Sequence, residues 1–95
     1  MKKVYLQYWE ESERGWGVRP DGCSLHTTLI NHKKFINSIY SDRDGDVPDE
    51  YDRVVGEPIE VMIKDTLSEL FEDGSLRILA YQLNNLIKLE EIVII

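Results

Sequence analysis

Two stretches of the chain alternate apolar and polar side chains, and this pattern constrains the fold more than any other feature. Residues 3–9 read KVYLQYW, and residues 58–64 read PIEVMIK with Ile59, Val61 and Ile63 on one face. Alternation of this kind, rich in β-branched and aromatic residues, is typical of strands that place one face on a core. The sequence therefore predicts a small sheet that contains both stretches.

A hairpin is predicted at the N-terminal end of this sheet. Residues 10–14 are charged and break the alternation, so they are expected to form the connection, and residues 16–19 the returning strand. The tripeptide PDG at residues 20–22 is typical of a turn, because proline fixes φ, aspartate bonds to nearby backbone and glycine adopts positive φ. Residues 23–26 are then expected to lead into a helix.

Helices are predicted for much of the remaining chain. They run from Thr27 or Thr28 to about Tyr40, over residues 66–72 after a cap at Asp65, and over residues 76–87. Threonine is a favourable cap, and the last segment keeps apolar residues at helical spacing. The apolar tail at 92–95 either continues the last helix or adds a strand to the sheet or to another subunit. We expect a single α+β domain over residues 1–95, with a small antiparallel sheet packed against two to three helices.

The net charge excludes some classes of partner. The chain carries 18 acidic and 11 basic residues, a formal charge of −7. Duplex nucleic acid requires concentrated lysine and arginine, so we expect none to bind. The bases gather in the first third of the chain, a distribution that suits a small anion better than a polymer. No apolar stretch is long enough to cross a bilayer and no signal peptide precedes Val4, so we expect a cytoplasmic protein without a membrane partner.

Neither a metal site nor a catalytic centre is predicted. Cys23 is the single cysteine and offers no disulfide or cysteine metal cluster. Asp42, Asp44 and Asp46 match the first positions of a calcium loop, but Arg53 stands where that loop needs a bidentate glutamate. No HExxH, P-loop, GxGxxG or CxxC pattern is present. We therefore expect a non-enzymatic binding protein without a cofactor.

The candidate binding residues lie in and around the predicted hairpin. Trp16 offers a flat face for stacking, and Arg19 a forked donor for a phosphate or carboxylate. Ser24 and His26 would add short hydrogen bonds from the predicted turn and helix entrance. In the alternative interpretation, Trp9 and Trp16 cover the end of the core and Arg19 pairs with an acid. The residues alone leave both interpretations open.

Two strings in the chain resemble a family of small uncharacterised proteins from tailed phages. They are GWGVRPDGCSLH at residues 15–26 and VPDEYDR at residues 47–53. Small, acidic, oligomeric phage proteins without catalytic residues often inhibit bacterial defence, and one class of them sequesters the cyclic nucleotides that serve as immune signals. The resemblance implies a phage anti-defence protein that acts in the host cytoplasm as a sponge for such a nucleotide.

The resemblance also implies roles for the candidate residues. Trp16 would stack on a base and Arg19 would hold a phosphate, while the others line the pocket or bond base and phosphate edges. A symmetric homo-oligomer would suit a two-fold cyclic ligand, because each subunit gives the same contacts. The predicted ligand-binding residues are Trp9, Trp16, Arg19, Ser24, His26 and Tyr51.

The alternative function is that of a protein-directed inhibitor. The acidic stretch at residues 42–57 would mimic nucleic acid and block a basic groove on a host defence or transcription protein. The two hypotheses differ in the residues that carry the activity. Ligand capture depends on Trp16 and Arg19, whereas mimicry depends on the carboxylates of the acidic stretch.

Overall fold

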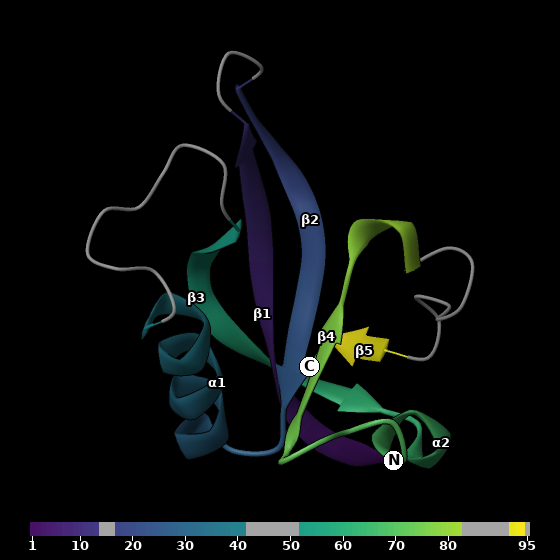
Figure 1. Cartoon of the computed structure of the whole chain (residues 1–95). Coiled ribbons are helices and arrows are strands. Elements are labelled where there is room, and N and C mark those ends of the chain that lie inside the picture. Colours follow the sequence, from purple (N-terminus) through teal and green to yellow (C-terminus); the bar gives the residue numbers. More distant parts are fainter. Residues whose placement is uncertain (14–16, 42–51, 83–91, 95) are drawn as a thin grey trace.

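The computed structural model describes residues 1–13, 17–41, 52–82 and 92–94. The elements in these ranges are β1 (Lys2–Glu13), β2 (Gly17–His26), α1 (Leu29–Ser41), β3 (Asp52–Ile63), α2 (Asp65–Ser68), β4 (Ser75–Ile78), the 3₁₀ helix η1 (Ala80–Gln82) and β5 (Ile92–Ile94). The strands form one antiparallel sheet in the order β4-β2-β1-β3-β5 (Figure 1). The predicted α+β class is confirmed.

The N-terminal hairpin is also confirmed, but both of its strands are longer than predicted. β1 pairs with β2 as far as Glu13 opposite Gly17. Residues 10–13, expected to form the connection, therefore belong to β1, and the expected turn at 20–22 belongs to β2. The outer residues of β2, at positions 17–20, are exposed, so their side chains stay in water while the backbone remains paired with β1.

Pro20 and Gly22 can both stand in β2 because β4 covers only part of it. β4 pairs with β2 from Cys23 to His26, so Pro20 lies beyond that pairing, on a stretch with edge character where proline is tolerated. Gly22 has a φ of 75°, and a Cβ added there would collide with the carbonyl oxygen of Ile78. Glycine is therefore required here because β2 and the end of β4 approach closely, and not because the chain forms a turn.

One face of the sheet holds the apolar core. Its members come from four strands and from α2, whose single buried residue is Leu67. The buried cluster comprises Val4, Leu6, Cys23, Leu25, Val61, Ile63, Leu67 and Ile78. Val61 and Ile63 confirm the inward face predicted for residues 58–64, and Ile59 packs against the cluster. Removal of this apolar surface from water supplies the main favourable contribution to folding.

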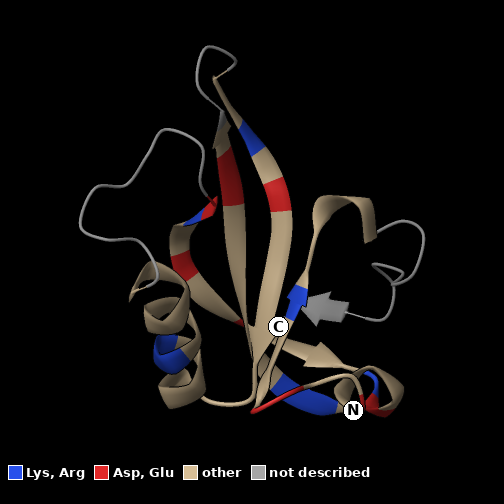
Figure 2. Cartoon of the chain, viewed as in Figure 1, with Lys and Arg blue, Asp and Glu red and all other residues tan. Residues whose placement is uncertain are grey.

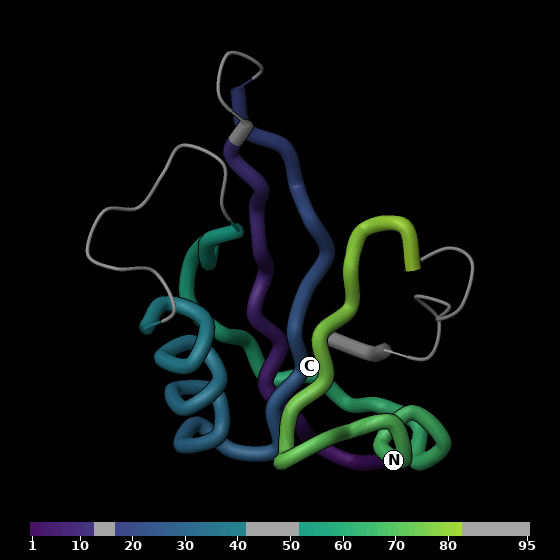
Figure 3. Tube along the Cα trace, in the orientation of Figure 1, coloured from purple at the N-terminus to yellow at the C-terminus, as the bar shows by residue number. Residues whose placement is uncertain are grey.

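α1 packs on the opposite face of the sheet. The N–H of Asn31 donates to Thr28 Oγ1 at 3.0 Å, so Thr28 caps the helix as predicted. The β1–β2 hairpin extends well past the helix (Figure 3). No residue of α1 is fully buried. The helix is therefore attached by specific ring contacts and hydrogen bonds and not by a broad aliphatic seam.

The predicted helix at residues 76–87 is wrong where the structure describes it. Ser75–Ile78 form β4 and Ala80–Gln82 form a single 3₁₀ turn, while residues 83–87 lie outside the described ranges. Pairing with β2 places Ile78 in the apolar core at 0% exposure. Long-range pairing therefore outweighs the helical spacing of the apolar residues.

Two further elements differ in extent from the prediction. The helix expected at 66–72 is confined to Asp65–Ser68, and Asp65 is its first residue, not its cap. Of the alternatives for the C-terminal tail, the added strand is confirmed, because Ile92–Ile94 pairs with β3. Among the described residues, no helix combines the length and apolar character that crossing a membrane requires.

The Gly22→Ala substitution should lower the free energy of unfolding by more than about 2 kcal/mol, because a side chain at positive φ costs about 1–2 kcal/mol and the new Cβ also meets Ile78. Gly56→Ala is the matched control. Gly56 has a φ of 69° with nothing within 4 Å of an added Cβ, so only the conformational cost applies. Denaturant unfolding followed by circular dichroism measures both, and equal losses would contradict the close approach at Gly22.

Candidate functional site

A series of hydrogen bonds runs across the sheet face beneath α1. Trp9 Nε1 donates to Ser24 Oγ at 2.8 Å. Ser24 Oγ lies 2.6 Å from His26 Nε2, and His26 Nδ1 lies 2.7 Å from Ser75 Oγ. Trp9 is 1% exposed, and Ser24 and His26 are 0% exposed. We call these four residues, Trp9, Ser24, His26 and Ser75, the polar chain.

Strand register brings the polar chain together. Ser24 and His26 are two residues apart on β2, so their side chains point to the same face, and His26 lies directly opposite Ser75 on β4. Trp9 stands where the register between β1 and β2 shifts. Such a bulge redirects a side chain, which here turns the indole toward Ser24. The arrangement thus follows from the pairing of three strands and not from a local motif.

Aromatic rings fasten α1 over the polar chain. The Phe35 ring lies 6.2 Å from that of Trp9, in an edge-to-face arrangement, and 5.2 Å from that of His26. Tyr40 makes a second edge contact with Trp9 at 6.4 Å. Its hydroxyl accepts from the backbone N–H of Val54 at 3.0 Å. Edge contacts of this kind are favourable beyond the area they bury, and they fix the helix to β1, β2 and β3 together.

A second buried polar group, Gln7, ties α1 to the centre of the sheet. The Gln7 amide nitrogen donates to the carbonyl oxygens of Val55 at 3.0 Å and Gly56 at 3.1 Å. Its amide oxygen therefore faces His32 Nε2, 2.8 Å away, and the ring nitrogen must donate. The His32 and His26 rings meet edge to face at 5.1 Å. Both histidines thus belong to the joint between the helix and the sheet.

Arg77 packs against the Trp9 ring and also binds the backbone of β2 and β4. Its guanidinium lies 5.0 Å from the centre of the Trp9 ring, a cation–π contact. It also donates to the carbonyl oxygens of Asp21 and Ile78 at 2.8 Å and of Cys23 at 3.0 Å. An arginine that satisfies this many backbone carbonyls is a structural anchor. It fixes the end of β4 against β2.

Three carboxylates gather beside Arg77 on the same face. One oxygen each from Glu11, Asp21 and Asp52 lie within 4.8 Å of one another, a spacing that a divalent cation could bridge. Guanidinium groups already contact them, however: Arg77 lies 3.3 Å from both aspartates, and Arg19 lies 3.0 Å from Glu11. Burial, followed by the hydrogen bond and charge of Asp21, raises the pKa of Asp52. The carboxylates at residues 42–46, which match a calcium loop only in part, lie outside the described ranges.

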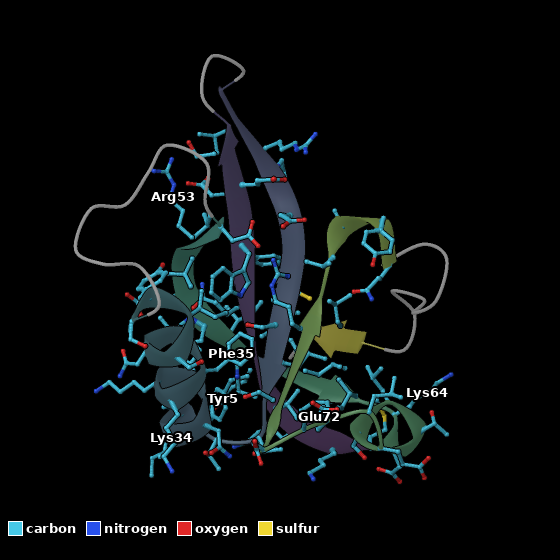
Figure 4. The ribbon with its side chains drawn as sticks, in the orientation of Figure 1. Tyr5, Lys34, Phe35, Arg53, Lys64 and Glu72 are labelled. Atoms are coloured by element: carbon cyan, nitrogen blue, oxygen red, sulfur yellow. The ribbon has the colours of Figure 1, made fainter. Side chains whose placement is uncertain are left out.

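An open groove of about 900 Å³ lies between α1 and β4. Its walls carry Asn31, Lys34, Phe35 and Ser38 from α1, and Glu72, Ser75 and Arg77 from the β4 side. Figure 4 labels Lys34 and Phe35 on α1 and Glu72 on the segment before β4. Ser75 and Arg77 are thus shared between the groove and the contacts around Trp9. A small ligand in this groove would lie next to Ser75 and Arg77 and so next to this network.

Burial sets the protonation states in this region. It lowers the pKa of His26 from 6.5 to about 4, and the charge of His32 adds to the effect. The pKa of His32 is lowered as well, mainly by burial. Burial raises the pKa of the Cys23 thiol to about 11. At neutral pH both imidazoles are therefore neutral and the thiol is protonated.

The structure brings together three of the predicted site residues and separates the fourth. Trp9, Ser24 and His26 form the polar chain, where protein groups hold them away from solvent. Arg19 lies on the outer part of the hairpin with its side chain 64% exposed, against Glu11. Trp16 and Tyr51 lie outside the described residues. Ligand binding by these side chains stays a prediction, and the three buried ones can act on a ligand only through groups that reach the surface.

Sequence reasoning did not find Gln7, Ser75 or Arg77. Arg77 fell in a segment predicted as a helix, and Ser75 stood immediately before it, so neither was expected to share a sheet face with His26. The strand β4 reads SLRI, and its alternation of polar and apolar residues was the one available signal. That signal is too short to outweigh the helical spacing that follows it.

Comparison of the chain with family models, with curated proteins and with solved structures found no match. The chemistry of the site is therefore inferred from its own residues. Those residues combine a buried floor, hydrogen-bonded from Trp9 to Ser75, with a polar groove above it. No buried side-chain nitrogen or oxygen in the described part of the chain lacks a hydrogen-bond partner.

The pKa of His26 predicts a loss of stability in mild acid. The unfolded chain takes up a proton near pH 6.5, whereas folded His26 resists it until about pH 4. The unfolded state therefore binds more protons in this window, and stability falls as pH drops from 6.5 to 4. The expected contribution of His26 is on the order of 3 kcal/mol, with His32 acting in the same direction. Denaturant unfolding across this pH range measures it.

In a His26→Gln variant this extra loss should largely disappear. The raised pKa of Asp52 acts in the opposite sense and is common to both proteins. An equally steep fall in the variant would contradict the role assigned to His26. A side-chain NMR titration of the wild type gives the same quantity without substitution, and a midpoint near 6.5 would contradict the effect of burial.

Proposed function

We propose that this chain is a non-enzymatic binding protein that captures a small nucleotide-like ligand in the groove between α1 and β4. One observation carries the proposal: the groove joins an aromatic ring, cationic groups, neutral polar groups and carboxylates in a single opening of about 900 Å³. Sites for small molecules commonly have volumes of 300–1,000 Å³, with a few polar groups that fix orientation.

The lining favours a nucleotide over a simple anion. Lys34 can contact a phosphate, and Figure 2 marks basic residues on both α1 and β4, the two sides of the groove. Phe35 offers apolar surface beside a base. Glu72 and Asp73, which also line the groove, would repel a bare polyanion but can accept hydrogen bonds from sugar hydroxyls or base amino groups. A ligand with both phosphate and hydroxyl or amino groups satisfies both sets.

The groups that could carry nucleophilic chemistry support a binding role. Cys23 is buried, and burial raises its pKa to about 11, which leaves almost no thiolate at neutral pH. Both ring nitrogens of His26 lie within hydrogen-bond distance of serine hydroxyls. With a pKa of about 4, this imidazole is a weak base. We infer that the site holds a ligand without transforming it.

The resemblance to small tailed-phage proteins extends this proposal to a biological role. In that role the protein is a homo-oligomer in the host cytoplasm, and it sequesters a cyclic nucleotide that serves as an immune signal. Sequestration needs a site that is formed before the ligand arrives, because ordering a flexible site would consume binding energy. The buried hydrogen bonds beneath the groove, which run from Trp9 to Ser75, are suited to that requirement.

Charge pairing makes the alternative, nucleic-acid mimicry, less favourable for the described part of the hairpin. Glu10 pairs with Arg53, and Glu11 pairs with Arg19. Each pair removes a negative charge that a mimic would present. The acids at residues 42–51, on which mimicry mainly depends, lie outside the described ranges.

A Lys34→Ala variant should bind a nucleotide about tenfold more weakly than the wild type, because it loses one charge-assisted contact. Thermal unfolding against cyclic dinucleotides, cyclic trinucleotides, ADP-ribose and AMP measures this. A ligand at a hundred times its dissociation constant stabilises the folded state by about 2.7 kcal/mol. Arg19→Ala is the matched control, since it removes a cation from the hairpin and not from the groove.

The two variants separate the possible sites. Loss of binding in Lys34→Ala alone supports the groove. Loss of nucleotide binding in Arg19→Ala alone would contradict the groove as the site and would indicate a site on the hairpin. No stabilisation by any nucleotide would contradict the proposed function and favour a protein partner.

A further inference from the structure

The direction of each hydrogen bond in the polar chain can be derived from Trp9. An indole N–H donates and never accepts, so Ser24 Oγ must accept the bond at 2.8 Å. The direction of this first bond is therefore independent of any choice of tautomer. It fixes what Ser24 can do with its own hydrogen.

The Ser24 hydroxyl is completely buried and needs an acceptor for that hydrogen. Within the described residues, the only other polar atom bonded to Ser24 Oγ is His26 Nε2 at 2.6 Å. Donation to His26 satisfies both atoms. The reverse arrangement, with Nε2–H donating to Ser24, would leave a buried O–H without an acceptor, a state that folded proteins avoid. His26 Nε2 is therefore the acceptor.

A neutral imidazole that accepts at Nε2 carries its proton at Nδ1. His26 Nδ1–H then donates to Ser75 Oγ at 2.7 Å. Ser75 Oγ has received a hydrogen bond and retains its own hydrogen. No described side chain or carbonyl accepts that hydrogen, and Ser75 lines the groove. Its O–H is the outward end of a series of donors that begins at Trp9.

We propose that Ser75 is a specificity-determining donor of the groove, and that its hydroxyl recognises a phosphate oxygen of the ligand. This inference rests on the proposed function and names the group that the same site selects. The partner must be an acceptor, because the chain of hydrogen bonds presents a hydrogen and not a lone pair. Lys34 on the facing wall favours a negatively charged acceptor.

The neutral state of His26 maintains this direction. A protonated imidazole would donate from both nitrogens and reverse the bond to Ser24. Burial and the neighbouring His32 ring both disfavour that state. The polar chain thus holds the Ser75 hydroxyl as a donor throughout the neutral range.

The hydrogen-bond direction can be measured without a ligand. Long-range ¹H–¹⁵N NMR of the full-length protein at pH 7 distinguishes the two neutral tautomers of His26. We expect the proton on Nδ1. A proton on Nε2 would overturn the proposal, whatever the protein binds, because Ser75 would then donate to the ring instead of to the groove.

Binding is then compared for AMP, adenosine and inorganic phosphate, with calorimetry on the wild type, Ser75→Ala and Ser75→Thr. We expect Ser75→Ala to weaken AMP binding at least tenfold and to leave adenosine binding unchanged. Ser75→Thr keeps the hydroxyl and should retain AMP. Binding of phosphate alone, equally sensitive to Ser75→Ala, would support the phosphate assignment without the nucleoside.

Each remaining outcome has a separate meaning. Unchanged AMP affinity in Ser75→Ala overturns this inference and leaves the proposed function standing. An equal loss for AMP and adenosine overturns the phosphate assignment, because Ser75 would then contact the nucleoside. Absence of nucleotide binding to the wild type contradicts the proposed function itself. If Ser75→Ala does not fold, the tautomer of the wild type and the binding of Ser75→Thr still decide the matter.

Discussion

The indole N–H of Trp9 can only donate a hydrogen bond, and much of the structure around it follows from that constraint. Its acceptor, Ser24, must lie on the neighbouring strand and must pass its own hydrogen onward to His26. His26 reaches β4 through Ser75. The side-chain bonds that start at this buried donor therefore connect β1, β2 and β4 in addition to their backbone pairing. Because an unsatisfied buried polar group is costly, loss of one of these hydrogen bonds destabilises the whole arrangement.

The two faces of the sheet have different roles: one contributes mainly to stability, and the other to specific contacts and to the proposed binding site. The apolar face supplies the driving force through side chains such as Val4 and Leu25, which are 0% exposed. The polar face supplies specificity, because its buried groups are hydrogen-bonded to particular partners on neighbouring elements. α1 depends on that second face, and it has no fully buried side chain of its own. The groove beside α1 therefore has a rigid floor and a wall attached through a few defined contacts.

The sequence predicts those parts of the fold that depend on local pattern. Alternation identifies the cores of β1 and β3, and the pair Thr27 and Thr28 indicates the start of α1, which the structure places after Thr28. The elements that sequence reasoning misplaced depend on partners far along the chain. Ser75 becomes part of a strand because it pairs with His26, 49 residues earlier, and helical spacing in the residues that follow points the other way. The predicted binding residues Ser24 and His26 do lie together, but their pairing also buries them, which residue types alone do not reveal.

Hydrogen exchange of the Trp9 indole N–H, followed by NMR, tests the central claim most directly. If this hydrogen is the buried start of the polar chain, it should exchange only when the protein unfolds. Its exchange rate should then be similar to that of backbone amides in the apolar core. Its protection should then correspond to the free energy of global unfolding. Exchange at the rate of an unfolded polypeptide would contradict the account. The indole would then be open to water, and the direction of the hydrogen bonds in the polar chain would no longer be fixed.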